Sequence, residues 1–523
     1  MSVIPCRNGE NFPPPEALRK DCSTDMEPDL AVCVSGTVNR PFPAELMFLL
    51  KRGSSRSKSS PNLPPGPGTI PILGNLHMMD LKKPQKTMTE WSKEYGPIFR
   101  IKLGLQEMVV LTGYETVKEA LVNEADVFAD RPFVPIFEDA RKGLVFAHGE
   151  NWKVMRRFTL ATLRDYGMGK RTIEDKITEE CSVLTKTMEI YGGKPFDIKR
   201  ILTAAVSNII VSILLGKRYE YEDAIFLRLL KTIRENIQLL GSPAVLLYNL
   251  FPKLGYFLGV HKIIMKNQKE LHDFIKTTFI EYLQDLDEND PRNFIESFLV
   301  WQKQENMKMT HGGYFHNKNL IGLVDDLFVA GTDTTSNTLS WAILLMMKYP
   351  EIQSKIQAEI AREIGDIQPR TEHRVKMPYT DAVIHEFQRF SNIIPSNVPH
   401  ATTMDITFKG FFIPKGTYII PLLTSVLRDE SQWEKPHEFY PEHFLDSEGK
   451  FVKRNAFMPF SAGRRVCAGE NLAKMELFLF FTNLLQKFTF QTPPGTSKDN
   501  LDLTPVVGFT STPMPYKTCA VLR

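Results

Sequence analysis

The segment Phe460-Ser461-Ala462-Gly463-Arg464-Arg465-Val466-Cys467-Ala468-Gly469 decides how the rest of this sequence is interpreted. It lies directly before an apolar stretch at 471–487, whose periodicity predicts a helix. The backbone N–H groups at a helix N-terminus present positive partial charge, which stabilises a nearby thiolate and tunes its basicity. We therefore interpret the segment as a loop that presents Cys467 as the thiolate ligand of a metal ion.

The spacing F-x-x-G-x-R-x-C-x-G is specific, and its residues suit a thiolate that binds iron in a flat macrocycle such as haem. Gly463 and Gly469 allow the backbone to approach a flat macrocycle without a clash from a Cβ atom. Arg465 can donate charge-assisted hydrogen bonds to a propionate of the macrocycle. The alternative is an ordinary buried cysteine at a junction between a loop and a helix, with arginines that are exposed by chance.

The other five cysteines, at positions 6, 22, 33, 181 and 519, have no comparable neighbours. The chain contains no C-x-x-C pair and no dense cysteine framework of the kind that small secreted domains need. We expect free thiols in a reducing compartment.

The cysteine loop resembles the haem-binding signature of the cytochrome P-450 superfamily, and the resemblance covers about residues 61–523. Its details are similar to the vertebrate microsomal family-two branch. The resemblance implies a mainly α fold with a small β region, shaped as a triangular α-rich prism, with haem b (iron protoporphyrin IX) as cofactor. It implies a monooxygenase that uses O2 and NADPH-derived electrons to hydroxylate or epoxidise small lipophilic substrates, such as fatty acids, steroids and xenobiotics. Two alternatives stay open: an electron-independent haem-thiolate isomerase, and a haem-binding protein without turnover.

A polar interruption in the apolar helix predicted at 319–348 is the second informative feature. The stretch Ala330-Gly331-Thr332-Asp333-Thr334-Thr335 stands in its middle, where a glycine costs about 0.5 to 1 kcal/mol relative to alanine and threonines can bend the helix. Such a defect can open a groove for dioxygen, where Asp333 and Thr334 relay protons. The alternative is one solvated acid and two threonines bonded to their own helix. Resemblance to the family pattern A-G-x-D-T-T favours the first interpretation and assigns both residues a catalytic role, Thr334 as the hydroxyl near oxygen.

Glu386 and Arg389 stand three residues apart, so they can form an ion pair on one face of a helix. On the surface such a pair contributes only about 0.2 to 0.5 kcal/mol and has no special role. The sequence at 378–389 resembles the E-x-x-R helix of the family, in which the pair is buried and holds the cysteine loop. The family usually completes this scaffold with an arginine. Here His443 takes that position, and a neutral imidazole is expected near pH 7.

The resemblance also implies which residues surround the cofactor and the substrate. Two propionates need cationic or donor partners when they are buried, and Trp152 and Arg156 stand one helical turn apart, so that both can point to one of them. The implied haem contacts are Arg131, Trp152, Arg156, His400, Phe460, Gly463, Arg465 and Gly469, with Cys467 as the metal ligand. The implied substrate pocket consists of Phe133, Val145, Phe146, Phe328, Ala330, Ile394, Val398 and Phe509. Each of these apolar residues could equally belong to the core.

Composition restricts the remaining possibilities. The chain has 523 residues, 42% of them hydrophobic and 24% charged, so it can form a large core. Its formal net charge of +3 provides no global field for nucleic acid, and no nucleic-acid partner is expected. Gly66-Pro67-Gly68 fails as a dinucleotide fingerprint, because no strand is predicted before it and Pro71 takes the place of the last glycine. If the enzyme uses nicotinamide reducing power, another protein must therefore deliver the electrons.

Residues 1–60 are expected to form a flexible N-terminal segment and a basic, Ser-rich linker that lacks a complete membrane anchor. The apolar stretch at 42–50 is far shorter than the ~20 residues that a spanning helix requires. A haem domain is expected at 61–523, with a β-hairpin at 98–111 and an extended region at 406–425. Long helices are predicted at 171–191, 224–240, 319–348, 351–364 and 471–487.

Besides the substrate and O2, two kinds of partner are expected. A basic surface near the cysteine suits an acidic NADPH-cytochrome reductase, with a b-type cytochrome as a second donor; the alternative is a solvated charged surface without a partner. The apolar segment at 248–260 can dip into a membrane interface. The expected location is the cytoplasmic face of the endoplasmic reticulum membrane, with peripheral or weakened attachment. The residues assigned to the basic surface are Lys153, Arg157, Lys453, Arg454, Arg464 and Lys474.

Overall fold

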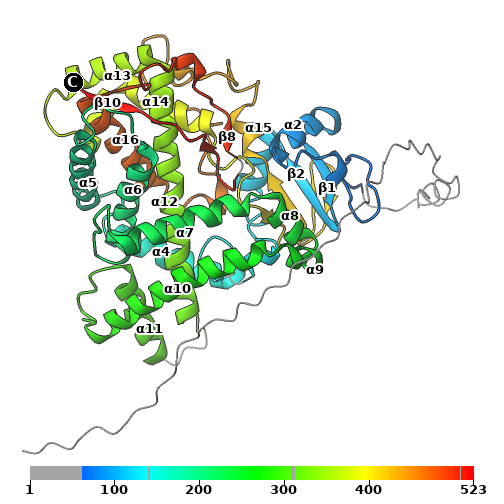
Figure 1. Cartoon of the computed structure of the whole chain (residues 1–523). Coiled ribbons are helices and arrows are strands. Elements are labelled where there is room, and N and C mark those ends of the chain that lie inside the picture. Colours follow the sequence, from blue (N-terminus) through cyan, green and yellow to red (C-terminus); the bar gives the residue numbers. More distant parts are fainter. Residues whose placement is uncertain (1–61, 139–141, 308–312, 507) are drawn as a thin grey trace, which may run out of the picture. The chain divides into compact units, whose positions relative to one another are not determined.

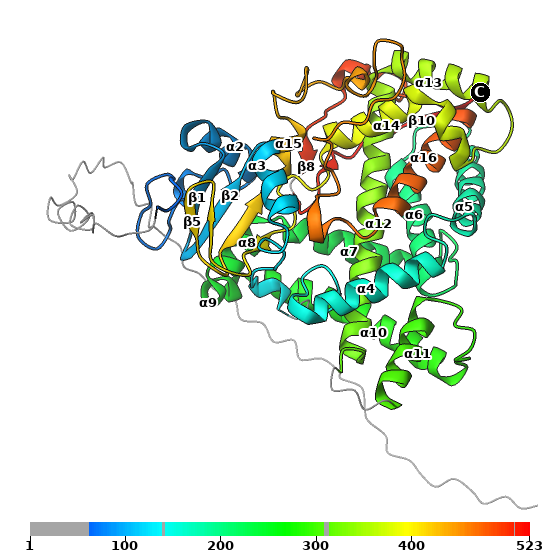
Figure 2. The same cartoon turned by 180° about the vertical axis from the view of Figure 1, so that it is seen from behind.

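The helical part of the chain is organised around one long helix, α12 (Asn317–Lys348). In the computed structural model, α6 (Ile198–Leu214), α14 (Pro378–Ser391) and α16 (Glu470–Lys487) pack against it, as Figure 1 and Figure 2 show from opposite sides. The largest cluster of buried apolar side chains is shared by these helices and their neighbours. The predicted mainly α fold with a small β region is confirmed.

The structure describes residues 62–138, 142–307, 313–506 and 508–523. Pro61–Arg523 forms one compact unit. The predicted flexible segment and linker at 1–60 lie outside the described residues. Within the four described ranges, no helix has both the length and the apolar character needed to cross a membrane.

The remaining helices surround this core or connect it to the sheet. Their bounds are α2 (Pro84–Tyr95), α3 (Tyr114–Lys118), α4 (Gly149–Asp165), α5 (Arg171–Glu189), α7 (Ala224–Leu240), α8 (Pro243–Leu250), α9 (Pro252–Gly255), α10 (Val260–Gln284), α11 (Phe294–Met307), α13 (Pro350–Glu363) and α15 (Leu423–Leu427). The five predicted long helices agree with α5, α7, α12, α13 and α16 to within two residues at each end. Local end signals explain this agreement: the Asp223 side chain accepts a hydrogen bond from the Phe226 N–H at the start of α7, and α13 begins at Pro350.

A four-stranded sheet in the order β1-β2-β6-β3 forms the largest β element. β1 (Ile98–Leu103) and β2 (Gln106–Leu111) form the predicted antiparallel hairpin, β2 runs parallel to β6 (Tyr418–Pro421), and β6 pairs with β3 (His400–Ala401). The other strands form two-stranded pairs: β4 (Ile406–Phe408) with β5 (Phe411–Ile413), β7 (Phe488–Gln491) with β10 (Cys519–Leu522), and β8 (Pro505–Val506) with β9 (Thr512–Pro513). The extended region predicted at 406–425 therefore corresponds to β4, β5 and β6, and the chain turns helical at Leu423.

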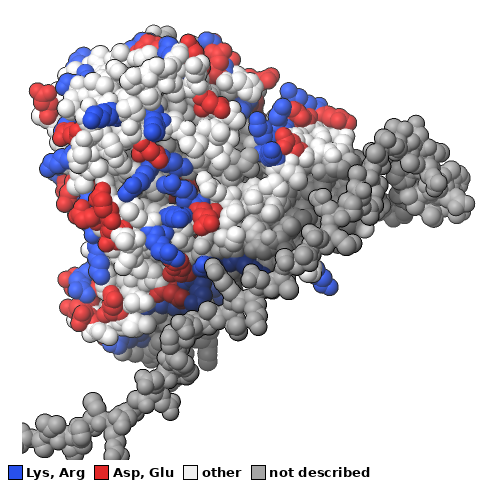
Figure 3. All heavy atoms as spheres, viewed as in Figure 1, with Lys and Arg blue, Asp and Glu red and all other residues white. Residues whose placement is uncertain are grey.

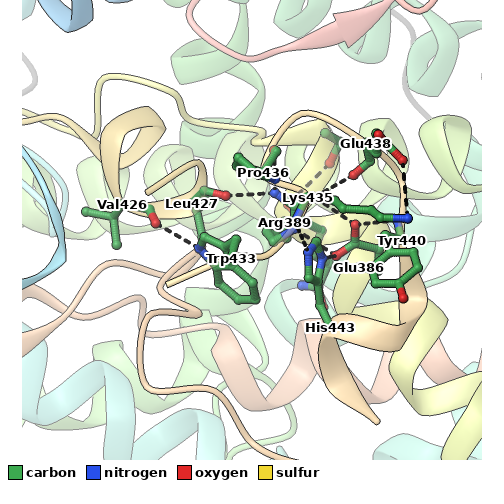
Figure 4. Close-up of polar contacts among 12 residues, drawn as sticks. Glu386, Arg389, Val426, Leu427, Trp433, Lys435, Pro436, Glu438, Tyr440 and His443 are labelled. Carbon is green, nitrogen blue, oxygen red and sulfur yellow. Dashed lines mark hydrogen bonds and ion pairs between the residues drawn. The ribbon is translucent and has the colours of Figure 1, made fainter. Parts of the chain in front are cut away.

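Glu386 and Arg389 form an ion pair inside the protein (Figure 4), with both side chains 0% exposed. Two hydrogen bonds of 2.7 Å join the guanidinium group to the carboxylate. The other donors of Arg389 reach the carbonyl groups of Leu427, Pro436 and Glu438 at 2.7 to 2.8 Å. The interpretation as a surface pair is therefore wrong: the pair fastens the segment from 427 to 438 onto α14.

His443 occupies the third position of this scaffold, as Figure 4 shows. Its Nδ1 lies 3.2 Å from the Glu386 carboxylate, and its Nε2 accepts a hydrogen bond of 3.1 Å from the Lys435 N–H. Because Nε2 accepts in this arrangement, Nδ1 is the ring nitrogen that donates to the carboxylate. The Tyr440 N–H donates to the same carboxylate at 2.8 Å.

We expect Arg389→Met to lower the free energy of unfolding by about 3 to 5 kcal/mol, because it leaves the Glu386 carboxylate buried and unpaired. The measurement is urea unfolding followed by circular dichroism. Lys269→Met is the control, since Lys269 and Asp273 form an exposed pair whose loss is expected to cost less than about 1 kcal/mol. Equal effects of the two substitutions would contradict the role of burial.

Candidate functional site

Cys467 and Thr334 line the same cavity, which has a volume of about 400 Å³. The cysteine loop forms one part of its wall, and the middle of α12 forms another. Helices α6, α7 and α10 supply further apolar lining. The structure therefore brings together the two sequence features that were most informative, although they lie more than 130 residues apart in the chain.

The cysteine loop is closed by its own backbone and depends on one glycine. The Cys467 N–H donates to the Phe460 carbonyl group at 3.0 Å. Gly463 has a φ of +72°, and a Cβ atom there would lie 1.6 Å from the Leu121 carbonyl oxygen. A Cβ atom at Gly469 would meet nothing closer than the Cys467 sulfur, at 3.9 Å. Packing against Leu121 thus requires a glycine at position 463, which could not be foreseen from the sequence. Gly469 instead leaves space beside the sulfur.

The sulfur of Cys467 is accessible from the cavity yet lies deep within the protein. Burial raises the pKa of the Cys467 thiol, and the backbone N–H groups of Gly469 and Glu470 and the charge of Arg156 act in the opposite direction. These N–H groups lie at the start of α16, as expected from the position of Cys467 directly before a predicted helix. The arrangement supports a thiolate once a metal cation adds its own charge.

Three guanidinium groups line the cavity and form no ion pair with a described carboxylate. Arg131 and Arg465 donate to backbone carbonyl groups at 2.7 to 3.5 Å, and Arg156 donates to the Val466 carbonyl at 2.6 Å. Arg465 also stacks on the Trp152 ring, 3.8 Å from its centroid. Burial lowers the pKa of all three arginines. Because arginine stays charged in proteins, this cluster favours a ligand with more than one negative charge.

His400 contributes an unused ring nitrogen close to this cluster. Its Nδ1 donates to the Phe128 carbonyl group at 2.6 Å, and its Nε2 is buried without a hydrogen-bond partner in the described part of the chain. Burial and the charges of Arg131 and Arg465 lower the pKa of His400. A carboxylate near Nε2 would favour a second proton on the ring and accept a hydrogen bond from it.

These groups fit haem b, the cofactor expected from the sequence. The Cys467 sulfur can bind the iron, and the arginines and His400 can donate to two propionates. The apolar lining and the space beside Gly469 suit a flat ring. One ligand thus accounts for the guanidinium groups without a carboxylate, the unpartnered nitrogen of His400 and the accessible sulfur.

Asp333 and Thr334 both line the cavity but have different partners. The Thr334 hydroxyl donates to the Ala330 carbonyl at 2.8 Å, within the helix. The Asp333 carboxylate is buried, and one of its oxygens accepts hydrogen bonds from Asn337 at 2.9 Å and from Thr510 at 2.8 Å. Burial raises the pKa of Asp333. The interpretation of this residue as a solvated acid is therefore wrong.

Gly331 has a packing role that the sequence argument did not foresee. A Cβ atom at this position would lie 2.5 Å from Cδ1 of Ile210 on α6. The glycine thus allows α12 and α6 to approach closely, and α12 continues as one helix through the polar stretch. The expectation of a groove for dioxygen at this glycine stays a prediction.

The structure brings most predicted site residues into the cavity wall. Among the expected haem contacts, Arg131, Trp152, Arg156, Phe460, Arg465, Cys467 and Gly469 line it. Among the expected pocket residues, Val145, Phe146, Ala330, Ile394, Val398 and Phe509 line it. Phe133 is 52% exposed and Phe328 is buried in the core, so neither is brought into the lining.

Several lining residues were missed by sequence reasoning. Asp326 accepts hydrogen bonds from the N–H groups of Leu144 and Val145 at 2.6 and 2.9 Å, and burial raises its pKa to about 7. Burial also raises the pKa of Glu476 to about 8. The apolar lining residues on amphipathic helices carry the same sequence signal as core residues. The missed residues include Ile210, Ile213, Ile233, Asn236, Ile237, Gln268, Leu271, Asp326, Glu476 and Thr510.

Comparison with known proteins agrees with this geometry. The family model described as Cytochrome P450 matches residues 64–520. Cytochrome P450 2K1 of Oncorhynchus mykiss is 50% identical over 485 residues, which cover 91% of this chain and 95% of that protein. Cytochrome P450 2K6 of Danio rerio is 50% identical over 456 residues, or 87% and 90% of the two chains. Cytochrome P450 2C5 of Oryctolagus cuniculus is 47% identical over 481 residues, or 91% and 96%.

We expect Arg465→Leu to speed the loss of haem about 10-fold or more, because a hydrogen bond to a charged group contributes about 1.5 to 3 kcal/mol. The measurement is haem transfer to apomyoglobin, followed by absorbance. Arg464→Gln is the control, because the neighbouring Arg464 is exposed and pairs with Asp126. If Arg465→Leu retained haem as long as the parent protein, this arginine would not hold a propionate.

Proposed function

Because the chain belongs to the cytochrome P450 family, and is therefore a haem-dependent monooxygenase, we propose that it hydroxylates or epoxidises small lipophilic substrates with O2 and electrons derived from NADPH. One observation carries the proposal: Cys467, Thr334 and Asp333 line a single cavity together with unpaired buried arginines. A redox partner must supply the electrons.

Cys467 is the proposed ligand of the haem iron. Haem bound through a thiolate supplies the electron density that favours cleavage of the O–O bond of dioxygen. The N–H groups of Gly469 and Glu470 moderate the negative charge of the sulfur. The proposed propionate partners are Arg131, Trp152, Arg156, His400 and Arg465, while Phe460, Gly463 and Gly469 shape the loop beside the ring.

Thr334 and Asp333 are the proposed proton carriers of the α12 wall. The Thr334 hydroxyl can pass its proton into the cavity and be reprotonated from the side of Asp333. Burial raises the pKa of Asp333, which favours a carboxyl group that holds a proton in reserve. An electron-independent isomerase needs no such proton supply, so these two residues favour the monooxygenase over that alternative.

The cavity lining supports small lipophilic substrates, with fatty acids, steroids and xenobiotics as candidate classes. Phe146 and Phe509 contribute aromatic surface, and aliphatic side chains come from α6, α7 and α10. Asn236 and Gln268 line the same cavity and can orient a substrate through hydrogen bonds. Predominantly apolar walls with a few polar groups are typical of sites that bind such molecules.

A basic groove beside the cysteine loop is the proposed docking site for an NADPH-cytochrome reductase or a b-type cytochrome. The groove has a volume of about 800 Å³ and includes Lys453, Arg454 and Lys474 of the predicted basic surface. Phe460 and Ser461 line both this groove and the haem cavity, so little protein separates the two. Positive charge here would speed the encounter with an acidic partner.

An exposed apolar surface at the end of α9 and directly after it supports attachment to the cytoplasmic face of the endoplasmic reticulum membrane. Leu254, Tyr256, Phe257 and Leu258 are 57%, 55%, 86% and 52% exposed. Figure 3 shows few charged side chains where α8 lies, whereas side chains of both signs of charge lie over the helices on the other side of this face. A contiguous exposed apolar patch of this kind is typical of a membrane-binding surface.

We expect the parent protein to give the long-wavelength Soret band of a thiolate-ligated haem in a reduced carbon-monoxide difference spectrum, and Cys467→Ala to lose it. The iron then lacks its proposed sulfur ligand. Cys519→Ala is the control, because Cys519 is a buried thiol in β10 and should leave the band unchanged. An unchanged band in Cys467→Ala would refute the assignment of the ligand.

We expect the double substitution Phe257→Asp with Leu258→Asp to weaken binding to phospholipid vesicles about 10-fold or more, because burying each large apolar side chain contributes about 1.5 to 3 kcal/mol. The measurement is sedimentation with vesicles of phosphatidylcholine and phosphatidylserine. Ile190→Asp is the control, since Ile190 is 84% exposed but lies after α5. Equal losses for both proteins would argue against a membrane contact at this surface.

A further inference from the structure

Thr510 is a cavity residue that the proposed function leaves without a role. It lies between β8 and β9, directly after Phe509, and its side chain is buried. Its hydroxyl donates to Oδ2 of Asp333 at 2.8 Å and accepts a hydrogen bond from Asn337 at 3.4 Å. The Asn337 amide also donates to the same oxygen of Asp333, at 2.9 Å. Two donors from different parts of the chain therefore converge on one carboxylate oxygen.

The segment that carries Thr510 is fastened to the helices around the cavity. The Phe509 N–H donates to the Ile237 carbonyl on α7 at 3.3 Å. The Ser511 carbonyl accepts a hydrogen bond of 2.9 Å from the indole of Trp341 on α12. Both neighbours of Thr510 are thus fixed, so its hydroxyl has a defined position relative to Asp333.

The hydrogen bond from Thr510 is the largest influence that favours the ionised form of Asp333. Burial raises the pKa of Asp333, and the bond from Thr510 opposes this shift, followed by Lys199 on α6, Asn337 and Arg234 on α7. Burial lowers the pKa of Lys199 to about 8, so this positive charge is itself partly lost in alkaline solution. Thr510 carries no charge and acts at every pH.

We propose that Thr510 is a positioning residue for the oxidation reaction, because it holds the Asp333 carboxylate in the orientation from which a proton passes to Thr334. The proposal rests on the proposed roles of Asp333 and Thr334. In each transfer the Thr334 hydroxyl releases its proton into the cavity and takes up one proton from the Asp333 carboxyl group, and Asp333 regains a proton from solvent without any change in oxidation state. Since Phe509 is the neighbouring residue, the substrate wall and the proton supply share one fixed segment.

The first test measures Asp333 in the resting, haem-loaded protein. An infrared pH titration follows its carboxyl C=O band, which Asp333→Asn identifies by difference. Thr510→Val removes the hydroxyl donor but keeps the shape of the side chain. If Thr510→Val does not fold, Thr510→Ala is measured in its place. We expect the midpoint to move to higher pH by about half a unit or more, since the ionised form loses a donor, and to return toward the parent value in Thr510→Ser.

The second test measures peroxide released per NADPH consumed, with a reductase and 7-ethoxycoumarin as the probe substrate. We expect Thr510→Val to raise this ratio about 3- to 10-fold, the effect of losing one hydrogen bond, and Thr510→Ser to restore it. In the Asp333→Asn background, Thr510→Val should have no further effect, because Thr510 acts through Asp333.

The outcomes separate the two proposals. An unshifted infrared midpoint in Thr510→Val, while Asp333→Asn still raises peroxide release, would overturn the role of Thr510 alone. A further increase in the double variant would also overturn it, because Thr510 would then act on the shape of the cavity. Parental peroxide release from Asp333→Asn would overturn the proton role of Asp333, and the inference about Thr510 with it.

Discussion

Buried positive charge is the constraint on which the haem site depends. Taking a guanidinium group out of water is costly unless an anion accompanies it, and three such groups line one cavity without a carboxylate partner among the described residues. Arg131 and Arg465 also hold backbone carbonyl groups on separate segments of the chain, so each has a structural task that does not depend on the ligand. A cofactor with two carboxylates completes an arrangement that the protein has already built. The Cys467 sulfur can bind the iron of the same cofactor, and the unpartnered nitrogen of His400 can face one of its carboxylates.

Three buried carboxyl groups near the cavity differ in what donates to them, and this difference separates their roles. Asp326 is held by two backbone N–H groups, which cannot move without the loop that carries them. The carboxylate of Glu476 has one oxygen without a partner in the described part of the chain. Only Asp333 receives two side-chain donors and also stands next to Thr334. Asp333 is therefore the one of these three carboxyl groups that other side chains hold beside the proposed partner in proton exchange.

Local signals made most of the fold and part of the site predictable. The cysteine loop and the five long helices carry their own end signals and periodicity, so neighbouring residues suffice to find them. Helix α6 was not predicted, because it is buried on nearly all sides and therefore lacks the amphipathic pattern of a surface helix. The sequence placed Phe133 and Phe328 in the pocket, but Phe133 is exposed and Phe328 is buried in the core, because a phenylalanine has the same sequence pattern in a cavity wall, on the surface and in the core. Thr510 contacts Asp333 across 177 positions, and no local pattern marks that contact.

The segment from 143 to 147 links the haem site to the substrate wall. Asp326 holds its N–H groups from α12, while Arg131 and Arg465 hold its carbonyl groups from the proposed propionate side. Val145 and Phe146 on this segment line the cavity, so their positions depend on both sets of bonds. When propionates draw on the free donors of the two arginines, the guanidinium groups become more firmly fixed, and so do the carbonyl groups that they hold. If the two arginines hold the propionates as proposed, the cofactor would help to shape the proposed substrate pocket through bonds made by the same two side chains.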